Sequence, residues 1–596
     1  MTTTKKNFKG IFNWTFLLIV IVGIIIVNII FSFLNKRWDM TEDQRYSLSE
    51  GTELFLQNDS VFTDRLSLKI YLAGNLPSEL KLFKNALEDK LKEFRQIAGK
   101  KIEYQFVNPL TGTEQEQQEL FETIYDKGKG IIPMDVTYMK DGAQNQLLIW
   151  PGAVIDYKGY TVNTVQLLPG TPPGKPYNLN DPAFGQMVQN AINNLEYMLI
   201  STFKRSIIEK RQRIAFLQGH GELTFAETQR ARALISPNYA IKDVTLNDSI
   251  GALDGVDGLV IARPRAPFSD KDLYIIDQFV MRGGRLMCFM DALYLNEDSL
   301  DMKGTVHTVR YATGLDKMLF DYGLKLNDNY VIDGNCAPKP VPLAKVSLIP
   351  WFFHVLATPT SHPIARNLEP VSLKYVNEVQ FVGNSDNRLT PILTSSTNST
   401  RTGMAPMVSL GLSMNYGQNP QLVQNPKDEN NKICLAGLSE GMYDSHYKNR
   451  IVEAFAKDPN SRYLEASKKE GKILLVGNGR FLENDYDSMK NEMTSQFMYR
   501  PTKVNNLRLD PKLAELGIPL YFGNQEFIQN MVDYMMGDNT VLDIRSRQID
   551  IHEIDNEKVK ANAGFYKIIN ILVPCLSIIL LGFVLYYVRK RKYTLY

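Results

Sequence analysis

Four consecutive residues, Gly219, His220, Gly221 and Glu222, form the pattern of the chain that most directly indicates chemistry. They follow a short apolar run and precede a predicted helix start, and loops at this place in parallel α/β sheets bind anions and other ligands. The G-x-G spacing begins like the dinucleotide-binding pattern, but Thr224 stands where that pattern has its third glycine. Three interpretations stay open: a structural turn, a loop that contacts a ligand or a partner, and a nucleotide site.

The motifs of the common enzyme classes are missing from the sequence. It contains no G-x-S-x-G elbow for a nucleophile, no complete P-loop, and no closely spaced pair of His or Cys residues. Cys288 lies among apolar residues of an expected strand, where a buried and inert thiol is the simpler interpretation. The G-x-G spacing recurs at Gly477 and Gly479, with Leu482 in the third position, as a weaker match. We therefore predict no catalytic residue, no cofactor and no metal site.

The overall composition is that of a folded chain with several domains. Of the 596 residues, 44% are hydrophobic and 22% are charged, and the net charge is +2. These values exclude global disorder, a collagen and a disulfide scaffold, and they give no indication of nucleic-acid binding. The length is that of about three or four domains.

Alternating strands and helices must position the loop at 219–222. Strands are expected at 213–217, 241–246, 256–262, 286–290 and 473–477, with capped helix starts at Thr224 and Ser269 and a further helix over 524–536. Strands that alternate with helices favour right-handed βαβ units and a parallel sheet. We assign this α/β domain to residues 213–540, with a long insertion at about 295–470.

A first extracytoplasmic α/β domain is expected over residues 66–170. Apolar residues recur every three or four positions over 79–98, which predicts an amphipathic helix that ends at Gly99. Strands at 66–72 and 102–107 and several short strands up to 168 make the domain β-rich. The arrangement resembles a thioredoxin-like fold, but it lacks the redox cysteine pair.

Connecting segments flank this first domain. Residues 35–65 are expected to form a juxtamembrane elbow, in which Ser47 and Glu50 have the spacing of a capping box. Residues 171–212 begin with a proline-rich linker, and one long connecting helix is predicted over 183–210.

Both ends of the chain carry an apolar segment long enough to cross a bilayer. Residues 11–34 and 568–588 contain no charged residue, and about 20 apolar residues span the hydrocarbon core. The first segment has no small-residue cleavage site, so we predict an anchor rather than a signal peptide. The expected fold class is therefore α/β, anchored in the membrane by one helix at each end.

Basic residues beside these segments predict the topology. The tails 1–10 and 589–596 carry lysines and arginines, which places both in the cytoplasm. The chain between the spans, which ends in a charged approach at 541–567, would then lie outside the cytoplasm, in the periplasm of a Gram-negative source. Asn28, Asn570 and Pro574 are candidate contacts with a partner helix, since an amide bonded across membrane helices contributes about 1 kcal/mol. The alternative is that these residues bond within the chain's own pair of helices.

Segments along nearly the whole chain, in this order, resemble the GldG-like family of gliding-motility-associated ABC transporter components of Bacteroidota, within the wider ABC-transporter auxiliary family. The segments are DMT at 39–41, RYSLS at 45–49, FLQGHGE at 216–222, PFS at 267–269, IDQF at 276–279, RGG at 282–284 with Asp291, HPI at 362–364, GN at 523–524 with Asn530, IRSR at 544–547, and Asn570-x-x-x-Pro574 with the basic tail.

The resemblance implies a subunit without ATPase activity that works with a polytopic ABC permease and a cytoplasmic ABC ATPase. It also implies a link to gliding motility and secretion, and a middle domain similar to a glutamine-amidotransferase-like (flavodoxin-like) fold without its nucleophile. We therefore predict an inner-membrane, periplasm-facing accessory subunit that couples the permease and ATPase to an envelope partner. The alternatives are a substrate-capture subunit of the same transporter, a hydrolase or amidotransferase relative that uses Cys288, and a standalone envelope scaffold.

Overall fold

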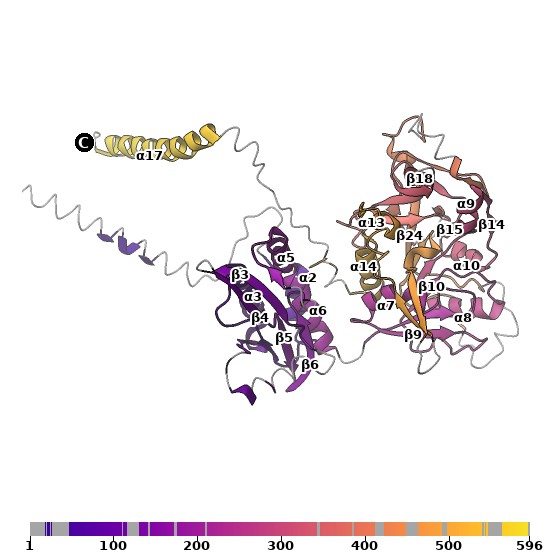
Figure 1. Cartoon of the computed structure of the whole chain (residues 1–596), viewed down its shortest axis with the longest axis horizontal. Coiled ribbons are helices and arrows are strands. Elements are labelled where there is room, and N and C mark those ends of the chain that lie inside the picture. The colour runs from indigo at the N-terminus through magenta and orange to yellow at the C-terminus, as the bar shows by residue number, and fades with distance from the viewer. Residues whose placement is uncertain are drawn as a thin grey trace, which may run out of the picture. The chain divides into compact units, whose positions relative to one another are not determined.

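The computed structural model describes residues 47–109, 130–140, 143–171, 176–208, 211–342, 346–383, 387–411, 422–448, 463–490, 497–538 and 563–593, together with single positions within 18–26, 111–118 and 542–545. The described residues from 47 to 545 belong to one compact unit, and the C-terminal helix belongs to a second. Figure 1 shows the elements of the whole chain.

The first domain contains a four-stranded mixed sheet and the predicted amphipathic helix. Helix α3 (Ser78–Ala98) buries its regularly spaced apolar residues, as the sequence predicted. The sheet contains β1 (Leu66–Ile70), β2 (Ile102–Phe106), β5 (Gly152–Tyr157) and β6 (Tyr160–Gln166), in the order β2-β1-β5-β6. Strands β1 and β2 are parallel, and β5 is antiparallel to both of its neighbours. A second, three-stranded sheet contains β3 (Met134–Lys140), β4 (Ala143–Ile149) and β7 (Tyr177–Asn178).

The helix that precedes this sheet does not begin as predicted. Helix α2 (Glu50–Gln57) is capped by Ser49, whose hydroxyl accepts a hydrogen bond from the Thr52 amide at 3.2 Å. The Ser49 amide donates to the carboxylate of Glu196 at 2.8 Å. The predicted capping box from Ser47 to Glu50 is therefore wrong, because a distant glutamate takes the position that a local one was expected to fill.

The predicted single helix over 183–210 is two helices. Helix α5 (Pro182–Asn193) and helix α6 (Leu195–Ile207) are separated at Asn194, where φ is −92° and ψ is 0°. The Asn194 side-chain amide donates to the Asn190 carbonyl at 2.9 Å. Asparagine side chains compete in this way for backbone hydrogen bonds, which interrupts a helix.

The second domain contains a ten-stranded sheet whose parallel half confirms the predicted strands. Its parallel strands are β9 (Ala240–Thr245), β8 (Arg213–Gln218), β10 (Gly258–Ala262), β11 (Arg285–Phe289) and β25 (Gly471–Val476), in this order across the sheet. Numbered along the chain, the order is 2-1-3-4-5, which is one of the common orders of doubly wound sheets.

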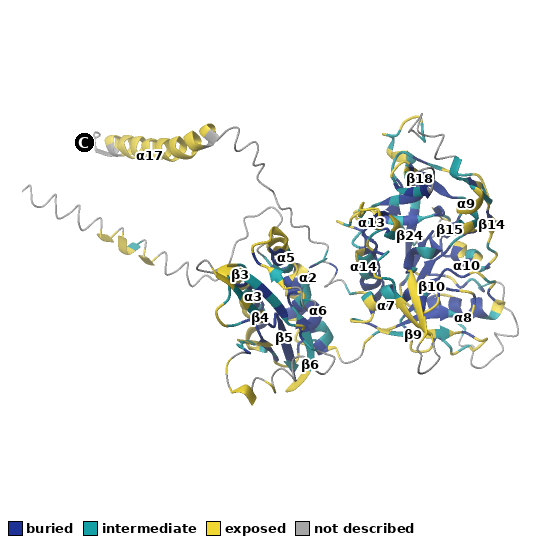
Figure 2. Ribbon diagram, in the orientation of Figure 1, coloured by how far each residue is buried: buried dark blue, intermediate teal, exposed yellow. Residues whose placement is uncertain are grey.

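Helices cover both faces of this parallel half. Successive residues of β11 point to opposite faces, so Leu286 and Cys288 join one apolar cluster while Met287 and Phe289 join another. The first cluster includes α8 (Asp270–Met281), and the second includes α7 (Gln229–Ile235) and α14 (Asn524–Met536). Figure 2 shows β10 buried in the middle of this half, whereas β9 at its edge includes exposed residues.

The predicted insertion continues the same sheet with antiparallel strands. From β25 outward they are β24 (Cys434–Gly441), β21 (Arg388–Thr394), β18 (Val346–Pro359) and β17 (Cys336–Pro342), and β19 (Val371–Lys374) also pairs with β18. Short ladders join β12 (Leu293–Tyr294) to β14 (Val309–Arg310), β13 (Thr305–His307) to β23 (Met407–Ser409), β15 (Leu324–Leu326) to β20 (Val379–Phe381), β16 (Val331–Asp333) to β22 (Ser399–Arg401), and β26 (Tyr486–Lys490) to β27 (Phe497–Pro501). The remaining helices are α9 (Glu297–Lys303), α10 (Leu315–Asp321) and α13 (Pro511–Glu515).

The C-terminal apolar segment forms a helix, α17 (Ala563–Tyr593), as predicted. Its segment Lys567–Val588 is long and apolar enough to cross a membrane, and its side chains are exposed. Pro574 lies inside this helix and has no N–H to donate to the Asn570 carbonyl, four residues earlier. The other predicted span, 11–34, is described at only a few positions, and Asn28 lies outside the described residues.

Candidate functional site

The loop at 219–222 is closed by contacts with the residues around it. Both ring nitrogens of His220 lie 3.2 Å from carboxylate oxygens, Nδ1 from Glu222 and Nε2 from Asp272. The imidazole stacks on the Phe268 ring with 3.8 Å between ring centroids. His220 and Glu222 are both buried. Both polar atoms of the His220 ring therefore have partners within the protein, as expected of a structural turn.

The backbone conformation of the loop explains its two glycines. Gly219 has a φ of +123° and Gly221 a φ of +75°, a region that residues with a Cβ rarely adopt. The His220 carbonyl between them accepts hydrogen bonds from the amides of Arg265 and Ala266, each at 2.8 Å. The glycine spacing therefore serves a tight turn that ties the end of β8 to the segment after β10.

The charge of His220 follows from its two carboxylate neighbours. Burial by itself lowers the pKa of the imidazole, but the hydrogen bonds to Glu222 and Asp272 outweigh it, and the pKa of His220 is raised above its ordinary value. A protonated His220 donates from both nitrogens. The loop after β8 is thereby linked to the first turn of α8.

This closed loop stands where ligands usually bind in such a fold. In a sheet of order 2-1-3-4-5 the strand order reverses between the first and third strands, here β8 and β10. The crevice outside that point contains the stacked His220 and Phe268, both buried. The geometry therefore favours the structural interpretation of the loop and directs attention to other parts of the same sheet edge.

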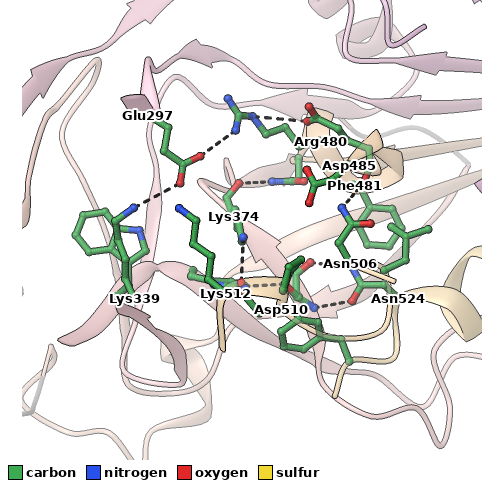
Figure 3. A pocket seen from close by; sticks show the side chains of 18 of the residues that line it. Glu297, Lys339, Lys374, Arg480, Phe481, Asp485, Asn506, Asp510, Lys512 and Asn524 are labelled. Carbon is green, nitrogen blue, oxygen red and sulfur yellow. Dashed lines mark hydrogen bonds and ion pairs between the residues drawn. The ribbon is translucent and has the colours of Figure 1, made fainter. Parts of the chain in front are cut away.

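A polar pocket of about 400 Å³ lies beyond the carboxyl end of β25, within the size range of small-molecule sites (Figure 3). Its lining residues come from the insertion on one side and from the chain after β25 on the other. They are Glu297, Asp298, Asp301, Pro338, Lys339, Pro340, Trp351, His354, Ser372 and Lys374 from the insertion, and Asn478, Arg480, Phe481, Glu483, Asp485, Asn506, Leu507, Asp510, Pro511, Lys512, Phe522 and Asn524 from the later segment.

Ion pairs across the pocket hold these two sides together. Glu297 on α9 accepts from Arg480 at 3.0 Å and lies 3.7 Å from Lys339, so it bridges the two cations in Figure 3. Lys339 also pairs with Asp301 at 2.8 Å. Lys374 on β19 pairs with Asp510 at 3.2 Å. The residues after β25 are thus fixed to the insertion by charge-assisted contacts.

The most buried polar groups of the pocket are uncharged or paired. His354 is buried beside Ser372, with 2.7 Å between Nε2 and the serine hydroxyl. Burial, with nearby Lys374 and Lys339, lowers the pKa of His354 to about 3, so the ring is neutral near pH 7. Asn524 brackets the Ser372 backbone, accepting from its amide at 2.9 Å and donating to its carbonyl at 3.0 Å.

The second G-x-G segment forms part of the pocket wall. The Gly479 amide donates to Asp291 at 2.6 Å, and the same carboxylate accepts from Arg263 at 3.1 Å. A Cβ on Gly479 would lie 2.8 Å from the Arg263 side chain, so only glycine fits without a shift. The Asn478 side-chain amide donates to the Lys374 carbonyl. This segment follows a strand in the way that the sequence indicated, but its amide and its neighbours bond to protein groups.

Sequence inspection missed most of the pocket residues. Those on β17 to β19 have no motif spacing, and two of them, Pro338 and Pro340, lie in a strand that a sequence pattern does not favour. Cys288, the thiol that the enzyme alternative would use, does not line the pocket: it is fully buried in β11, and burial raises the pKa of its thiol. Among the described residues, no group of three His, Cys, Asp or Glu side chains is placed to hold a metal ion.

Comparison with known families identifies the second domain. Residues 211–509 match the model of a family described as an ABC-type uncharacterized transport system, the ABC-transporter auxiliary family. The chain belongs to this family. The expected membership of the auxiliary family is thereby confirmed, and the matched range includes the parallel strands, the insertion and most of the pocket. Five lining residues lie after the matched range: Asp510, Pro511, Lys512, Phe522 and Asn524.

Other comparisons add little to this assignment. Residues 42–156 match a domain of unknown function (DUF7088). No curated protein matches the chain. A solved structure titled "mmIFT52 N-terminal domain" is 12% identical, with a TM-score of 0.27, and the match covers 46% of this chain and 88% of that one. The auxiliary-family match therefore carries the functional assignment.

Proposed function

We propose that this auxiliary-family chain is a membrane-anchored, periplasm-facing accessory subunit of an ABC transporter of the gliding-motility-associated, GldG-like type of Bacteroidota. In this proposal it couples an ABC permease and a cytoplasmic ABC ATPase to an envelope partner. The observation that carries the proposal is the family match over residues 211–509. The apolar segment Lys567–Val588 of α17 is followed, within the same helix, by Arg591 and Lys592, which supports an anchor whose C-terminal tail is cytoplasmic.

The coupling role is supported by how the chain leaves the second domain on its way to α17. Arg545 donates to Asn530 and Asp533 of α14 at 2.6 and 3.0 Å, and to the Tyr197 hydroxyl of α6 at 2.8 Å. Ile544 beside it is buried and belongs to the apolar cluster of the first domain. A displacement of the C-terminal segment would therefore act on elements of both domains.

We further propose that the chain is not an enzyme and that partner subunits hydrolyse ATP. The buried thiol of Cys288 and the missing P-loop support this proposal. For the domains, we propose a thioredoxin-like first domain and an amidotransferase-like second domain. The strand orders β2-β1-β5-β6 and 2-1-3-4-5 support these assignments.

Purification of the tagged full-length chain from native membranes in mild detergent tests the accessory role. We expect a polytopic permease and a P-loop ATPase to be recovered in stoichiometric amounts. A variant that ends before residue 563 lacks α17 and should lose both partners while the remaining domains stay folded. Recovery of the chain alone, or an unchanged complex without α17, would contradict the proposal.

The pocket favours a second candidate function, capture of a transported small molecule. Its volume of about 400 Å³ and its position at the carboxyl edge of the parallel sheet support this role. Native mass spectrometry of the purified chain should then detect a bound small molecule. We expect that molecule to be lost when Arg480→Met removes a pocket cation, whereas the partner subunits should still be recovered.

A further inference from the structure

The charges that line the pocket are only partly paired. Among the described lining residues there are four cations and six carboxylates. Three cations form the ion pairs across the pocket described above, with Glu297, Asp301 and Asp510 among their partners. Lys512, Asp298 and Asp485 form no ion pair with any described residue, and all three are exposed. The pocket therefore presents one unpaired cation and two unpaired carboxylates.

We propose that the pocket binds a small zwitterion with one carboxylate and at least one ammonium group, of the size of an amino acid or a short peptide. The proposal rests on the substrate-capture role and is independent of the coupling role. The ligand carboxylate pairs with Lys512, and its ammonium group pairs with Asp298, since the charge of Asp485 already acts on Arg230. Binding removes water from these groups, so a simple anion or cation leaves a desolvated charge without a partner, which is costly.

The distribution of exposed and buried polar groups in the pocket agrees with the same ligand. The unpaired charges are at exposed positions. The buried polar lining groups are the neutral His354, the amides of Asn478 and Asn524, and the already paired Lys339 and Asp510. A peptide has charged ends and an uncharged, hydrogen-bonding middle. Charged ends at the exposed positions and amide groups near His354 and Asn524 match this distribution of charge.

Calorimetric titration of the detergent-solubilised full-length chain tests the proposal. The probes are alanine, tri-alanine, and tri-alanine with an acetylated N-terminus and an amidated C-terminus. We expect at least one of the zwitterionic probes to bind and the doubly capped peptide to bind at least about tenfold more weakly. Alanine and tri-alanine distinguish an amino-acid site from a peptide site.

Two charge-removing variants then locate the binding. Asp298→Asn and Lys512→Met should each weaken binding of the zwitterion by about tenfold. Asp64→Asn and Lys100→Met remove equivalent exposed charges in the first domain and should leave binding unchanged. Because all four side chains are exposed, none of these variants should impair folding.

Three results would overturn the proposal: no binding of any probe up to about 10 mM, equal binding of the capped and uncapped peptides, or equal binding by the pocket variants and their controls. Each result is separable from the accessory role, since recovery of the permease and ATPase is measured on the same preparations. Loss of zwitterion binding with an intact complex rejects the ligand alone. Zwitterion binding by a chain that recovers no transporter subunit supports the ligand and rejects the complex.

Discussion

Replacement of Arg545 by methionine should loosen the contacts that join Arg545 to α14 and α6. The guanidinium is 13% exposed, and its partner Asp533 is 3% exposed. Besides Asp533, it donates to Asn530 and to the hydroxyl of Tyr197, whose ring it also faces at 4.8 Å. Arg545→Met keeps a side chain of similar length and removes all of these donors.

The magnitude follows from the charge that remains. Removing one partner of a buried ion pair costs about 3–5 kcal/mol, because the other charge stays buried and unpaired. Among the described residues, the Asp533 carboxylate would keep only the hydrogen bond from the Tyr239 hydroxyl, at 2.9 Å. An effect of this size corresponds to an increase of about a hundredfold or more in local opening of α14.

The effect should depend on pH. Burial raises the pKa of Asp533 to about 6, from an ordinary value of 3.8, although Arg545 acts to lower it. The folded chain therefore binds this proton more tightly than the unfolded chain, and the resulting stabilisation is lost as pH rises through about 6. Without Arg545 the pKa of Asp533 rises further. The cost of Arg545→Met should therefore be full at pH 8 and smaller at pH 5, where Asp533 is protonated and needs no cation.

Hydrogen–deuterium exchange of the full-length chain in detergent measures this opening. Peptides that cover α14 should exchange faster in Arg545→Met at pH 8, by about a hundredfold after correction for intrinsic rates. Arg65→Met, which removes an exposed pair with Glu103 at 3.4 Å, is the matched control and should have little effect. Exchange of α14 that is the same in both variants, or a cost that is larger at pH 5 than at pH 8, would refute this reasoning.

Three further predictions concern the sheet edge and its core. His220 should titrate above its ordinary pKa of 6.5 in NMR spectra, and the stabilisation that its charge provides should be lost as pH rises through this raised pKa of the folded state. An ordinary or lower pKa would contradict the pairing of His220 with its two carboxylates. Gly479→Ala should lower the free energy of unfolding by about 1–3 kcal/mol because its Cβ meets Arg263, whereas Gly403→Ala, with nothing within 4 Å, should be near neutral in thermal melts. Cys288 should stay unmodified by a thiol reagent under native conditions and react after denaturation, as judged by mass spectrometry of the labelled peptide; native labelling would favour the enzyme alternative.

Local patterns predicted the elements better than their connections. The periodic apolar residues gave α3 and α14, and alternation of strands with helices gave the parallel strands. Two of the predicted helix caps form, since Thr224 and Ser269 find their partners within three residues. The cap at Ser47 failed because Glu196 lies 147 residues from Ser49, a separation that no local pattern records. The 2-1-3-4-5 order was likewise beyond local patterns, because it depends on which strands pair across the chain.

The candidate site was hard to predict for a related reason. Nothing in the spacing of Lys339, Lys374 and Arg480 indicates that they line one pocket, since sheet pairing and the fold after β25 bring them together. The sequence instead favoured the loop of His220, because glycine, histidine and glutamate in a short run are also the residues of ligand-binding turns. Residue type and spacing alone do not distinguish a loop whose polar groups are covered by other residues of the same protein from a loop that is open to a ligand.

Two places along the carboxyl edge of the parallel strands, one at β8 and one at β25, show what separates a filled loop from an open pocket. At β8, two residues that follow β10 cover the His220 ring: Phe268 stacks on it, and Asp272 pairs with its Nε2 atom. At β25, charges of the insertion pair across a cavity with charges of the later segment, while Asp298 and Lys512 form no ion pair with a described residue. Both places lie beyond the carboxyl ends of parallel strands, but of the two only the place at β25 has both a cavity and charged side chains without an ion pair to a described residue. The proposed ligand site therefore lies at the part of the edge that the insertion forms, and we expect family members that bind different ligands to differ in the insertion.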